Sequence, residues 1–159
     1  MTKKKTNAMK LLEGKKVPYE SYEYPPNLRD AREVAAALDW PSGQVFKTLV
    51  VPRPKPGKPL LMMIPADRQL DLKKLAKAVS EKKLRMATQR EAERLTGLQV
   101  GGISALALLN KGFDVYLDES ALAYDQIVIS GGQRGLQIKL AVADLVKVTR
   151  ARMVDASRI

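Results

Sequence analysis

The short connections between strand-like segments constrain the fold of this chain most strongly. Residues 45–51 and 60–64 are apolar runs, and only the proline-rich stretch 52–59 joins them. A crossover between parallel strands needs about a dozen residues or more, so these runs are expected to pair antiparallel as a hairpin. The sequence therefore predicts a mixed α/β fold, in which a largely antiparallel sheet is surrounded by helices.

Apolar spacing and residues typical of caps and turns predict the other elements. Thr88 and Glu91 have the spacing of a capping box at the start of a helix. A single domain is expected over 1–159, with 1–5 as a flexible basic tail. Further strands are expected at 17–24, 83–86, 115–117, 126–130 and 136–140, and helices at 7–14, 31–38, 72–79, 89–97 and from 144 onward.

The chain contains neither cysteine nor histidine. Their absence excludes disulfides, a cysteine nucleophile, a zinc–thiolate site and a Ser-His-Asp triad. An enzyme of this composition has to use lysine, tyrosine, hydroxyl groups, carboxylates, backbone amides and groups of the substrate itself. No metal and no other cofactor is expected.

The net charge of +11 favours a polyanionic partner, because binding to phosphates releases counterions. Between Arg68 and Arg94 there are 9 basic residues and 4 acidic ones, so the excess is a local patch. A solvated surface is the alternative explanation. There is no apolar run of membrane-spanning length, and the basic N-terminus leads into no apolar segment of a secretory signal. A cytoplasmic location without membrane contact is therefore expected.

Lys47 interrupts the apolar run 45–51. A lysine at such a position has to extend to the surface, form an ion pair or point into a polar cleft. In a cleft, its ammonium group could hold a phosphate or polarise an ester carbonyl. The exposed face of an edge strand is the alternative position.

Paired glycines at 101–102 and 131–132 predict two turns that a ligand can approach closely through free backbone N–H groups. Neither pair has the spacing of a phosphate-binding loop, and each could be only a turn. Ser104 and Ser130 lie beside them and, without a histidine base, are interpreted as positioning groups. Tyr24 could offer its ring and hydroxyl group to a ligand, or could belong to the core.

Four segments together resemble the YbaK/EbsC family of Cys-tRNA(Pro) deacylases and related prolyl-tRNA editing domains. They follow in order over nearly the whole chain: QVFKTLV at 44–50, QLDLKKLA at 69–76, TGLQVGGIS at 96–104 and SGGQRGL at 130–136. The resemblance implies a single-domain fold with a curled, barrel-like, mostly antiparallel sheet surrounded by helices. It also implies trans-editing, the hydrolysis of the ester between a wrongly attached amino acid and the terminal adenosine of tRNA.

The resemblance also implies which residues form the site. Lys47 is expected to anchor the terminal nucleotide or the substrate carbonyl, and amides around Gly101 to hold the reacting carbonyl. Ser130 and Tyr24 are expected to orient the aminoacyl group. The implied partners are the tRNA acceptor end and prolyl-tRNA synthetase, and the chain itself is expected to be a monomer. The remaining residues assigned to substrate binding are Thr48, Gly102, Ser104, Gly131, Gly132 and Gln137.

Two positions depart from the pattern of the Cys-tRNA(Pro) deacylases. Gln137 stands where those proteins often have an acidic residue, and Ala105 where proline is frequent. A neutral amide does not pair with a substrate ammonium group as a carboxylate does. Cysteine, alanine or another small amino acid are therefore all candidate acyl groups. A non-catalytic tRNA- or synthetase-binding module with the same fold is the main alternative. A general DNA-binding protein is suggested only by the charge.

Overall fold

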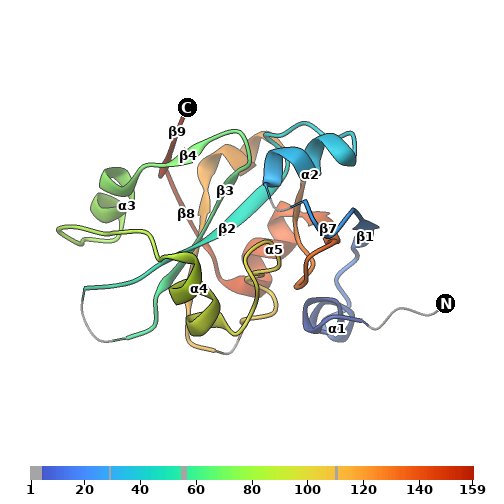
Figure 1. Ribbon diagram of the computed structural model, residues 1–159, viewed down its shortest axis with the longest axis horizontal. Helices are drawn as coiled ribbons and strands as arrows, with labels where there is room; N and C mark the ends of the chain where they lie inside the picture. Colours follow the sequence, from blue (N-terminus) through green and yellow to red (C-terminus); the bar gives the residue numbers. More distant parts are fainter. Residues whose placement is uncertain (1–4, 29, 55–56, 110) are drawn as a thin grey trace.

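The structure is a computed structural model that describes residues 5–28, 30–54, 57–109 and 111–159 (Figure 1). The helices are α1 (Asn7–Gly14), α2 (Ala31–Ala37), α3 (Leu72–Ala78), α4 (Gln89–Thr96), the 3-10 helix η1 (Glu119–Ala123) and α5 (Val142–Thr149). The strands are β1 (Glu20–Glu23), β2 (Phe46–Val51), β3 (Leu60–Pro65), β4 (Gln69–Leu70), β5 (Asp114–Asp118), β6 (Gln126–Ser130), β7 (Leu136–Ala141), β8 (Arg152–Val154) and β9 (Ser157–Arg158).

The strands form three sheets, ordered β1-β7-β6, β2-β3-β5-β8 and β4-β9. Within the described residues, β3-β5 and β5-β8 pair parallel and the other pairs are antiparallel. The hairpin predicted from its short connection is confirmed, because β2 pairs antiparallel with β3. The turn predicted at the second glycine pair joins β6 and β7, which also pair antiparallel. The predicted mixed α/β fold with mostly antiparallel strands is therefore correct.

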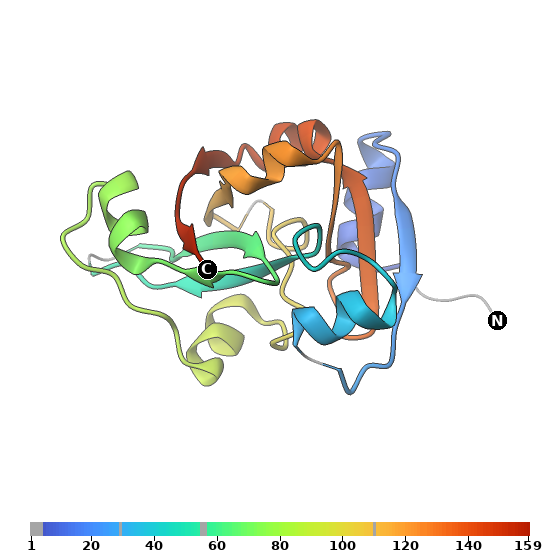
Figure 2. The same ribbon diagram turned by 90° about the horizontal axis from the view of Figure 1, so that it is seen from above.

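The two larger sheets join where β2 and β6 lie next to each other. Val45 and Val128 form an isolated parallel bridge, and the Val128 N–H donates to the Gln44 carbonyl oxygen at 3.0 Å. The sheets thereby continue into one another, and Figure 2 shows β7 standing across the β2–β3 layer. This arrangement agrees with the curled sheet implied by the family resemblance. Closure of the sheet into a barrel stays a prediction.

The helices begin where the sequence places a capping residue. Thr6, Asp30 and Asp71 each accept a hydrogen bond from a backbone N–H in the first turn of α1, α2 and α3. Thr88 and Glu91 form the predicted capping box of α4, which ends at Gly97 with a φ of 73°. Local hydrogen-bonding chemistry therefore sets most helix boundaries.

Several local predictions differ from the structure. Residues 83–86 form no strand: only the Ala87 N–H reaches β2, donating to the Val50 carbonyl oxygen at 3.1 Å. Strand β1 is shorter than the predicted 17–24. Helix α5 begins at Val142, before Asp144, and has no side-chain cap. Strands β8 and β9 were not predicted, because they are too short to show an alternating pattern.

Two predictions fall partly outside the described residues. The proline-rich turn at 52–59 includes residues 55–56, and the basic tail at 1–5 includes 1–4. Lys5 is described, and its ammonium group forms an ion pair with Glu13. The single domain over 1–159 stays a prediction.

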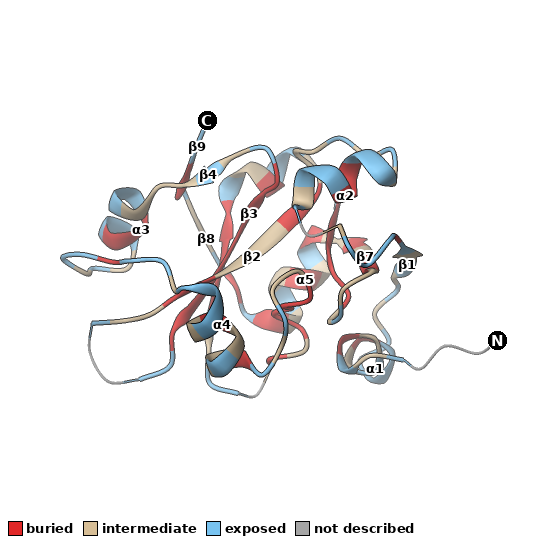
Figure 3. Cartoon of the chain, in the orientation of Figure 1, coloured by how far each residue is buried: buried red, intermediate tan, exposed pale blue. Residues whose placement is uncertain are grey.

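Two apolar clusters lie on opposite faces of β3, which is buried along its whole length (Figure 3). Leu61 and Met63 belong to the larger cluster, whereas Leu60, Met62 and Ile64 pack on the α3 side. The sequence of β3 is a continuous apolar run because an apolar cluster covers each of its two faces. Within the described part of the chain, no helix has the length and apolarity needed to cross a membrane.

Candidate functional site

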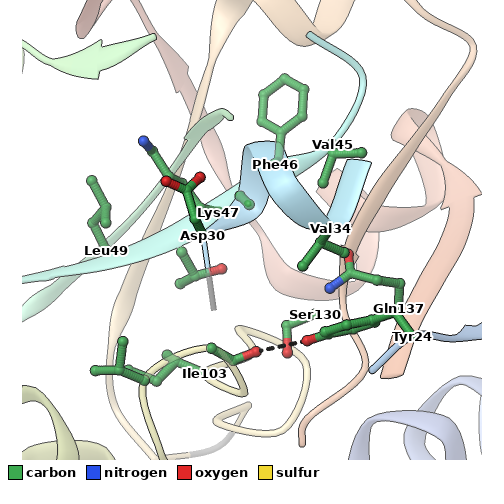
Figure 4. Close-up of a pocket in the computed structure, with 14 residues that line it drawn as sticks. Tyr24, Asp30, Val34, Val45, Phe46, Lys47, Leu49, Ile103, Ser130 and Gln137 are labelled. Atoms are coloured by element: carbon green, nitrogen blue, oxygen red, sulfur yellow. Dashed lines mark hydrogen bonds between the residues drawn. The ribbon is translucent and has the colours of Figure 1, made fainter. Parts of the chain in front are cut away.

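A cavity with a volume of about 230 Å³ lies where β2, α2 and the first glycine turn meet (Figure 4). Its apolar walls include Val34, Val45, Phe46 and Ile103. The polar residues predicted from the sequence that line it are Tyr24, Lys47, Thr48, Gly101, Ser130 and Gln137. The fold therefore brings together residues from five separate segments of the chain.

Lys47 lies half-buried on β2 and lines the cavity. Burial lowers the pKa of its ammonium group, Asp30 and Asp67 oppose this shift, and Arg32 reinforces it. Figure 4 shows Asp30 beside Lys47 at the cavity. Among the described residues, no hydrogen bond or ion pair engages the Lys47 Nζ atom. The ammonium group is therefore available to a ligand.

The turn at Gly101 requires glycine, because the φ of this residue is +94°. The turn is held through the residue before it. The Val100 N–H donates to Glu93 Oε2 at 2.9 Å, and Arg134 Nε donates to the Val100 carbonyl oxygen at 2.6 Å. No described residue accepts a hydrogen bond from the Gly101 N–H. The turn is thus fixed, and the backbone N–H of a residue that lines the cavity has no partner in the described chain.

The two glycine turns are packed directly against each other. A Cβ atom on Gly102 would lie 2.9 Å from backbone atoms of Gln133 and Arg134. A Cβ atom on Gly131 would lie 2.6 Å from Leu136 Cγ. Glycine at 102 permits the close backbone packing that fixes the position of the Gly101 turn, and glycine at 131 leaves room for the Leu136 side chain within the second turn's own hairpin.

Three polar side chains line the cavity near this turn. The Tyr24 hydroxyl donates to the Gly101 carbonyl oxygen at 3.4 Å, and Ser130 Oγ accepts from the Gly132 N–H at 3.2 Å. Ser130 pairs with Gln137 across β6 and β7. Gln137 is only 6% exposed, and no described residue donates to its Oε1 atom. A buried acceptor without a partner costs about 1–3 kcal/mol, which a bound donor would offset.

Four residues assigned to substrate binding do not line this cavity, namely Gly102, Ser104, Gly131 and Gly132. The three glycines shape the turns behind the wall. Ser104 is fully buried, and its Oγ atom accepts hydrogen bonds from the N–H groups of Leu106 and Ala107 at 3.2 and 3.4 Å. The structure therefore gives Ser104 a role in shaping the loop that follows the turn.

Asp30 lines the cavity, although its position in the sequence is that of an ordinary cap before α2. The capping bond exists: the Arg32 N–H donates to Asp30 Oδ1 at 2.8 Å. Nothing in the local sequence distinguishes this carboxylate from an ordinary cap, because its proximity to Lys47 depends on how α2 packs beside β2. The described residues contain no group of three or more carboxylates placed to hold a metal ion.

The arrangement suits the stabilisation of negative charge on an acyl oxygen. Lys47, with its half-buried ammonium group, and Gly101, whose N–H has no partner in the described chain, line one small cavity with apolar walls. Donors fixed in a partly dry site stabilise a developing oxyanion more strongly than they would in water. The polar edge formed by Tyr24, Ser130 and Gln137 could hold the rest of the substrate.

Comparison with known proteins identifies the family. The model of the aminoacyl-tRNA editing domain matches residues 25–148. EbsC of Enterococcus faecalis, named as a candidate Cys-tRNA(Pro)/Cys-tRNA(Cys) deacylase, is 40% identical over 97% of this chain and 94% of its own length. A proline–tRNA ligase of Caldicellulosiruptor bescii is 26% identical over 87% of this chain, which corresponds to 24% of the ligase.

A solved structure is similar over nearly its full length. The crystal structure of a candidate trans-editing enzyme for prolyl-tRNA synthetase superimposes with a TM-score of 0.82 and 28% identity, covering 96% of both chains. The family match, the EbsC similarity and this superposition confirm the resemblance drawn from the four sequence segments. This chain belongs to the aminoacyl-tRNA editing domain family.

Proposed function

We propose that this chain is a trans-editing aminoacyl-tRNA deacylase. It hydrolyses the ester between a wrongly attached amino acid and the terminal adenosine of tRNA. The first substrate to test is Cys-tRNA(Pro). The alternatives are tRNAs that carry alanine or another small amino acid. One observation carries the proposal: Lys47, with no ion-pair partner among the described residues, lines a small cavity that also contains the unpartnered amide of Gln137. Membership of the editing family supports it.

The size of the cavity supports a small acyl group. Its volume of about 230 Å³ is below the range of roughly 300–1,000 Å³ that accommodates drug-sized ligands. A short aminoacyl group fits such a space, and the adenosine to which it is attached then lies at the rim. Val34, Phe46 and Ile103 limit the length of the acyl side chain.

The hydrolysis needs few protein groups because the ester is already activated. The oxygen of water bonds to the acyl carbon, the ester C–O bond breaks, and the ribose oxygen leaves with the electron pair and takes up a proton. The products are the free amino acid and tRNA with a free terminal hydroxyl. Holding the reactants in position supplies much of the rate increase for such a step. Proton transfer can use the amine, thiol or ribose hydroxyl of the substrate.

Each polar group of the cavity has a proposed role. The Lys47 ammonium and the Gly101 N–H stabilise the acyl oxygen as it becomes negative. Tyr24 and Ser130 orient the aminoacyl group, with Thr48 beside Lys47 on β2. The Gln137 Oε1 atom accepts a hydrogen bond from the substrate ammonium.

Gln137 bears on the choice of amino acid. A neutral amide binds an ammonium group more weakly than a carboxylate does. Recognition then depends more on the fit of the side chain against the apolar walls. A pocket gains only about 1–3 kcal/mol from one methylene of difference, which is why a separate hydrolytic site is needed to remove near-isosteric errors.

The proposed setting is the cytoplasm, next to prolyl-tRNA synthetase. The similarity to part of two proline–tRNA ligases supports this partner, because a related segment belongs to those enzymes. The tRNA acceptor end is the proposed macromolecular substrate.

The test is deacylation of a labelled panel: Cys-, Ala-, Ser- and Pro-tRNA(Pro), together with Cys-tRNA(Cys). Lys47→Met is assayed beside Lys139→Met, a matched lysine on β7 outside the cavity lining. We expect hydrolysis of a cysteinyl or alanyl ester that Lys47→Met abolishes and Lys139→Met preserves. Full activity of the Lys47 variant would refute the proposal. No hydrolysis across the panel with intact tRNA binding would support a non-catalytic module.

A further inference from the structure

A group of exposed cations on the segment 82–94, which leads into the first glycine turn, has no acidic partner. We call Lys82, Lys83, Arg90 and Arg94 the basic strip; all four are exposed. None of them takes part in an ion pair within the described part of the chain. No ion pair of the described chain therefore uses their charge; Arg94 alone lies in the last turn of a helix, α4, where a cation complements the helix dipole.

The acidic residues within the same stretch are already engaged. Glu91 accepts two hydrogen bonds from Arg85, each of 2.8 Å, and one from the Thr88 N–H at 3.0 Å. Glu93 accepts from the Val100 N–H at 2.9 Å. The carboxylates hold helix α4 and the glycine turn, so the charge that faces solvent along the strip is positive.

The strip leads toward the cavity. The segment 82–88 reaches β2 through the hydrogen bond from the Ala87 N–H to the Val50 carbonyl oxygen. Helix α4 follows and runs into the turn whose residues Val100 and Gly101 line the cavity. Figures 1 and 2 show α4 and α2 on the same face of the molecule, on either side of β2.

We propose that the basic strip is the docking surface for the phosphate backbone of the tRNA acceptor stem. The proposal rests on the function proposed above, because the 3′ end of that stem has to enter the cavity. A row of cations without acidic partners matches a polyanion, and lysine and arginine side chains bind phosphates without reading the base sequence. The acceptor stem is an RNA duplex, and proteins recognise such a duplex mainly through its shape and backbone.

A second basic surface provides the matched control. Lys15, Lys16, Lys147 and Arg150 line a groove of about 490 Å³ between α1 and α5 together with Asp144. We call it the rear groove, because Figure 2 shows α5 on the side of the molecule opposite α4. Its cations follow or end helices, where they complement the helix dipoles, and this local role accounts for them without a ligand.

The experiment compares two quadruple variants with the same change in net charge. The strip variant is Lys82→Gln, Lys83→Gln, Arg90→Gln and Arg94→Gln; the groove variant is Lys15→Gln, Lys16→Gln, Lys147→Gln and Arg150→Gln. Binding of uncharged tRNA is measured by fluorescence anisotropy between 50 and 200 mM salt, which needs no catalysis. Hydrolysis of cysteinyl-tRNA and of a short cysteinyl-adenosine ester is measured in parallel, and thermal melting checks folding.

We expect the strip variant to bind tRNA about tenfold more weakly or worse, and its salt dependence to lose roughly 3 units of slope. It should retain normal hydrolysis of the short ester, whereas the groove variant should bind tRNA almost as well as the unmodified protein. Equal losses in both variants, or a larger loss in the groove variant, would overturn the proposal. So would a strip variant that loses binding to prolyl-tRNA synthetase but not to tRNA.

The two proposals fail in different ways. If tRNA binds through the strip but no ester is hydrolysed, the docking surface stands and the deacylase function is wrong. If the short ester is hydrolysed in a Lys47-dependent way while both variants bind tRNA normally, the function stands and the strip is not the docking surface.

Discussion

The interior of the molecule contains two polar regions that differ in how their polar atoms are satisfied. Around Asp118, which is 2% exposed, the chain supplies all the partners: Oδ1 accepts from the Ala156 N–H at 3.0 Å, and Oδ2 accepts from Ser157 Oγ at 2.9 Å and from Ser120. Arg68 Nε in turn donates to Ser157 Oγ at 2.7 Å. At the cavity, by contrast, the Lys47 ammonium and the Gln137 oxygen have no partner in the described chain.

The polar groups around Asp118 therefore hold the fold together, whereas those at the cavity are open to a ligand. Asp118 ends β5 and fixes the C-terminal segment, whose strand β9 pairs with β4. A buried polar group that is fully hydrogen-bonded to its own chain adds order to the fold. Buried polar groups left open at a cavity lower stability slightly and are available to a ligand.

Asp118→Asn should lower the free energy of unfolding by about 2–4 kcal/mol, because an amide NH₂ then faces donors that had bonded to a carboxylate oxygen. Chemical denaturation measures the change. The folded fraction should retain its deacylation rate. A stable Asp118 variant with lost activity would reverse the roles assigned to the two regions.

Arg134→Met should lower kcat by about tenfold to a hundredfold with little change in KM, because the donor that fixes the Val100 carbonyl is lost and the Gly101 turn can shift. Arg53→Met is the control, since Arg53 pairs with Asp114 away from the cavity lining. Steady-state kinetics and melting measure both variants. A change in KM alone, or an equal loss in the control, would contradict a positioning role for Arg134.

Gln137→Leu should leave stability unchanged or raise it by up to about 1 kcal/mol, because an unpartnered acceptor is replaced by an apolar group. Its kcat/KM should fall by about tenfold, in line with the loss of a hydrogen bond to a charged group. Ser157→Ala is the comparison from the other region, and it should destabilise the protein without affecting kcat/KM. If Gln137→Leu destabilises the protein as much as Ser157→Ala does, the two polar regions do not differ in the way described.

The pH at which activity is lost on the alkaline side should shift in opposite directions when Asp30 and Arg32 are replaced. Asp30 raises the pKa of Lys47, so Asp30→Asn should lower that pKa further and shift the alkaline loss of activity to lower pH. Arg32 lowers the pKa of Lys47, so Arg32→Gln should raise it and shift the loss to higher pH. Asparagine also caps helices well, so Asp30→Asn changes the charge without removing the cap of α2. Shifts of the same sign in both pH–rate profiles would contradict a role for the Lys47 ammonium.

Local patterns predicted the parts of the fold that depend on local chemistry. The short connection after residue 51 predicted the β2–β3 hairpin, and Thr88 with Glu91 predicted the start of α4. Strands β8 and β9 could not be predicted, because they exist through pairing with β5 and β4 rather than through a pattern of their own. Residues 83–86 are the opposite case: a strand was predicted there, but the segment forms none, and only the N–H of the following Ala87 bonds to β2.

The site was predictable where a residue conflicted with its surroundings. Lys47 drew attention because a charge interrupts an apolar run, and Gly101 because paired glycines mark an unusual backbone. Asp30 and Arg134 carry no such signal: one has the pattern of a helix cap and the other of a surface arginine. The role of Asp30 depends on the packing of α2 beside β2, and that of Arg134 on the packing of the two glycine turns against each other; only the three-dimensional structure reveals either.

A ¹⁵N NMR titration with a non-hydrolysable amide analogue of cysteinyl-adenosine shows which of the two polar regions binds the substrate. We expect the largest shifts at the Gly101 N–H and the Gln137 side-chain amide, with the Ala156 N–H beside Asp118 unchanged. If the analogue saturates the protein without shifts at Gly101 and Gln137, or with the largest shift at Ala156, the cavity is not the binding site.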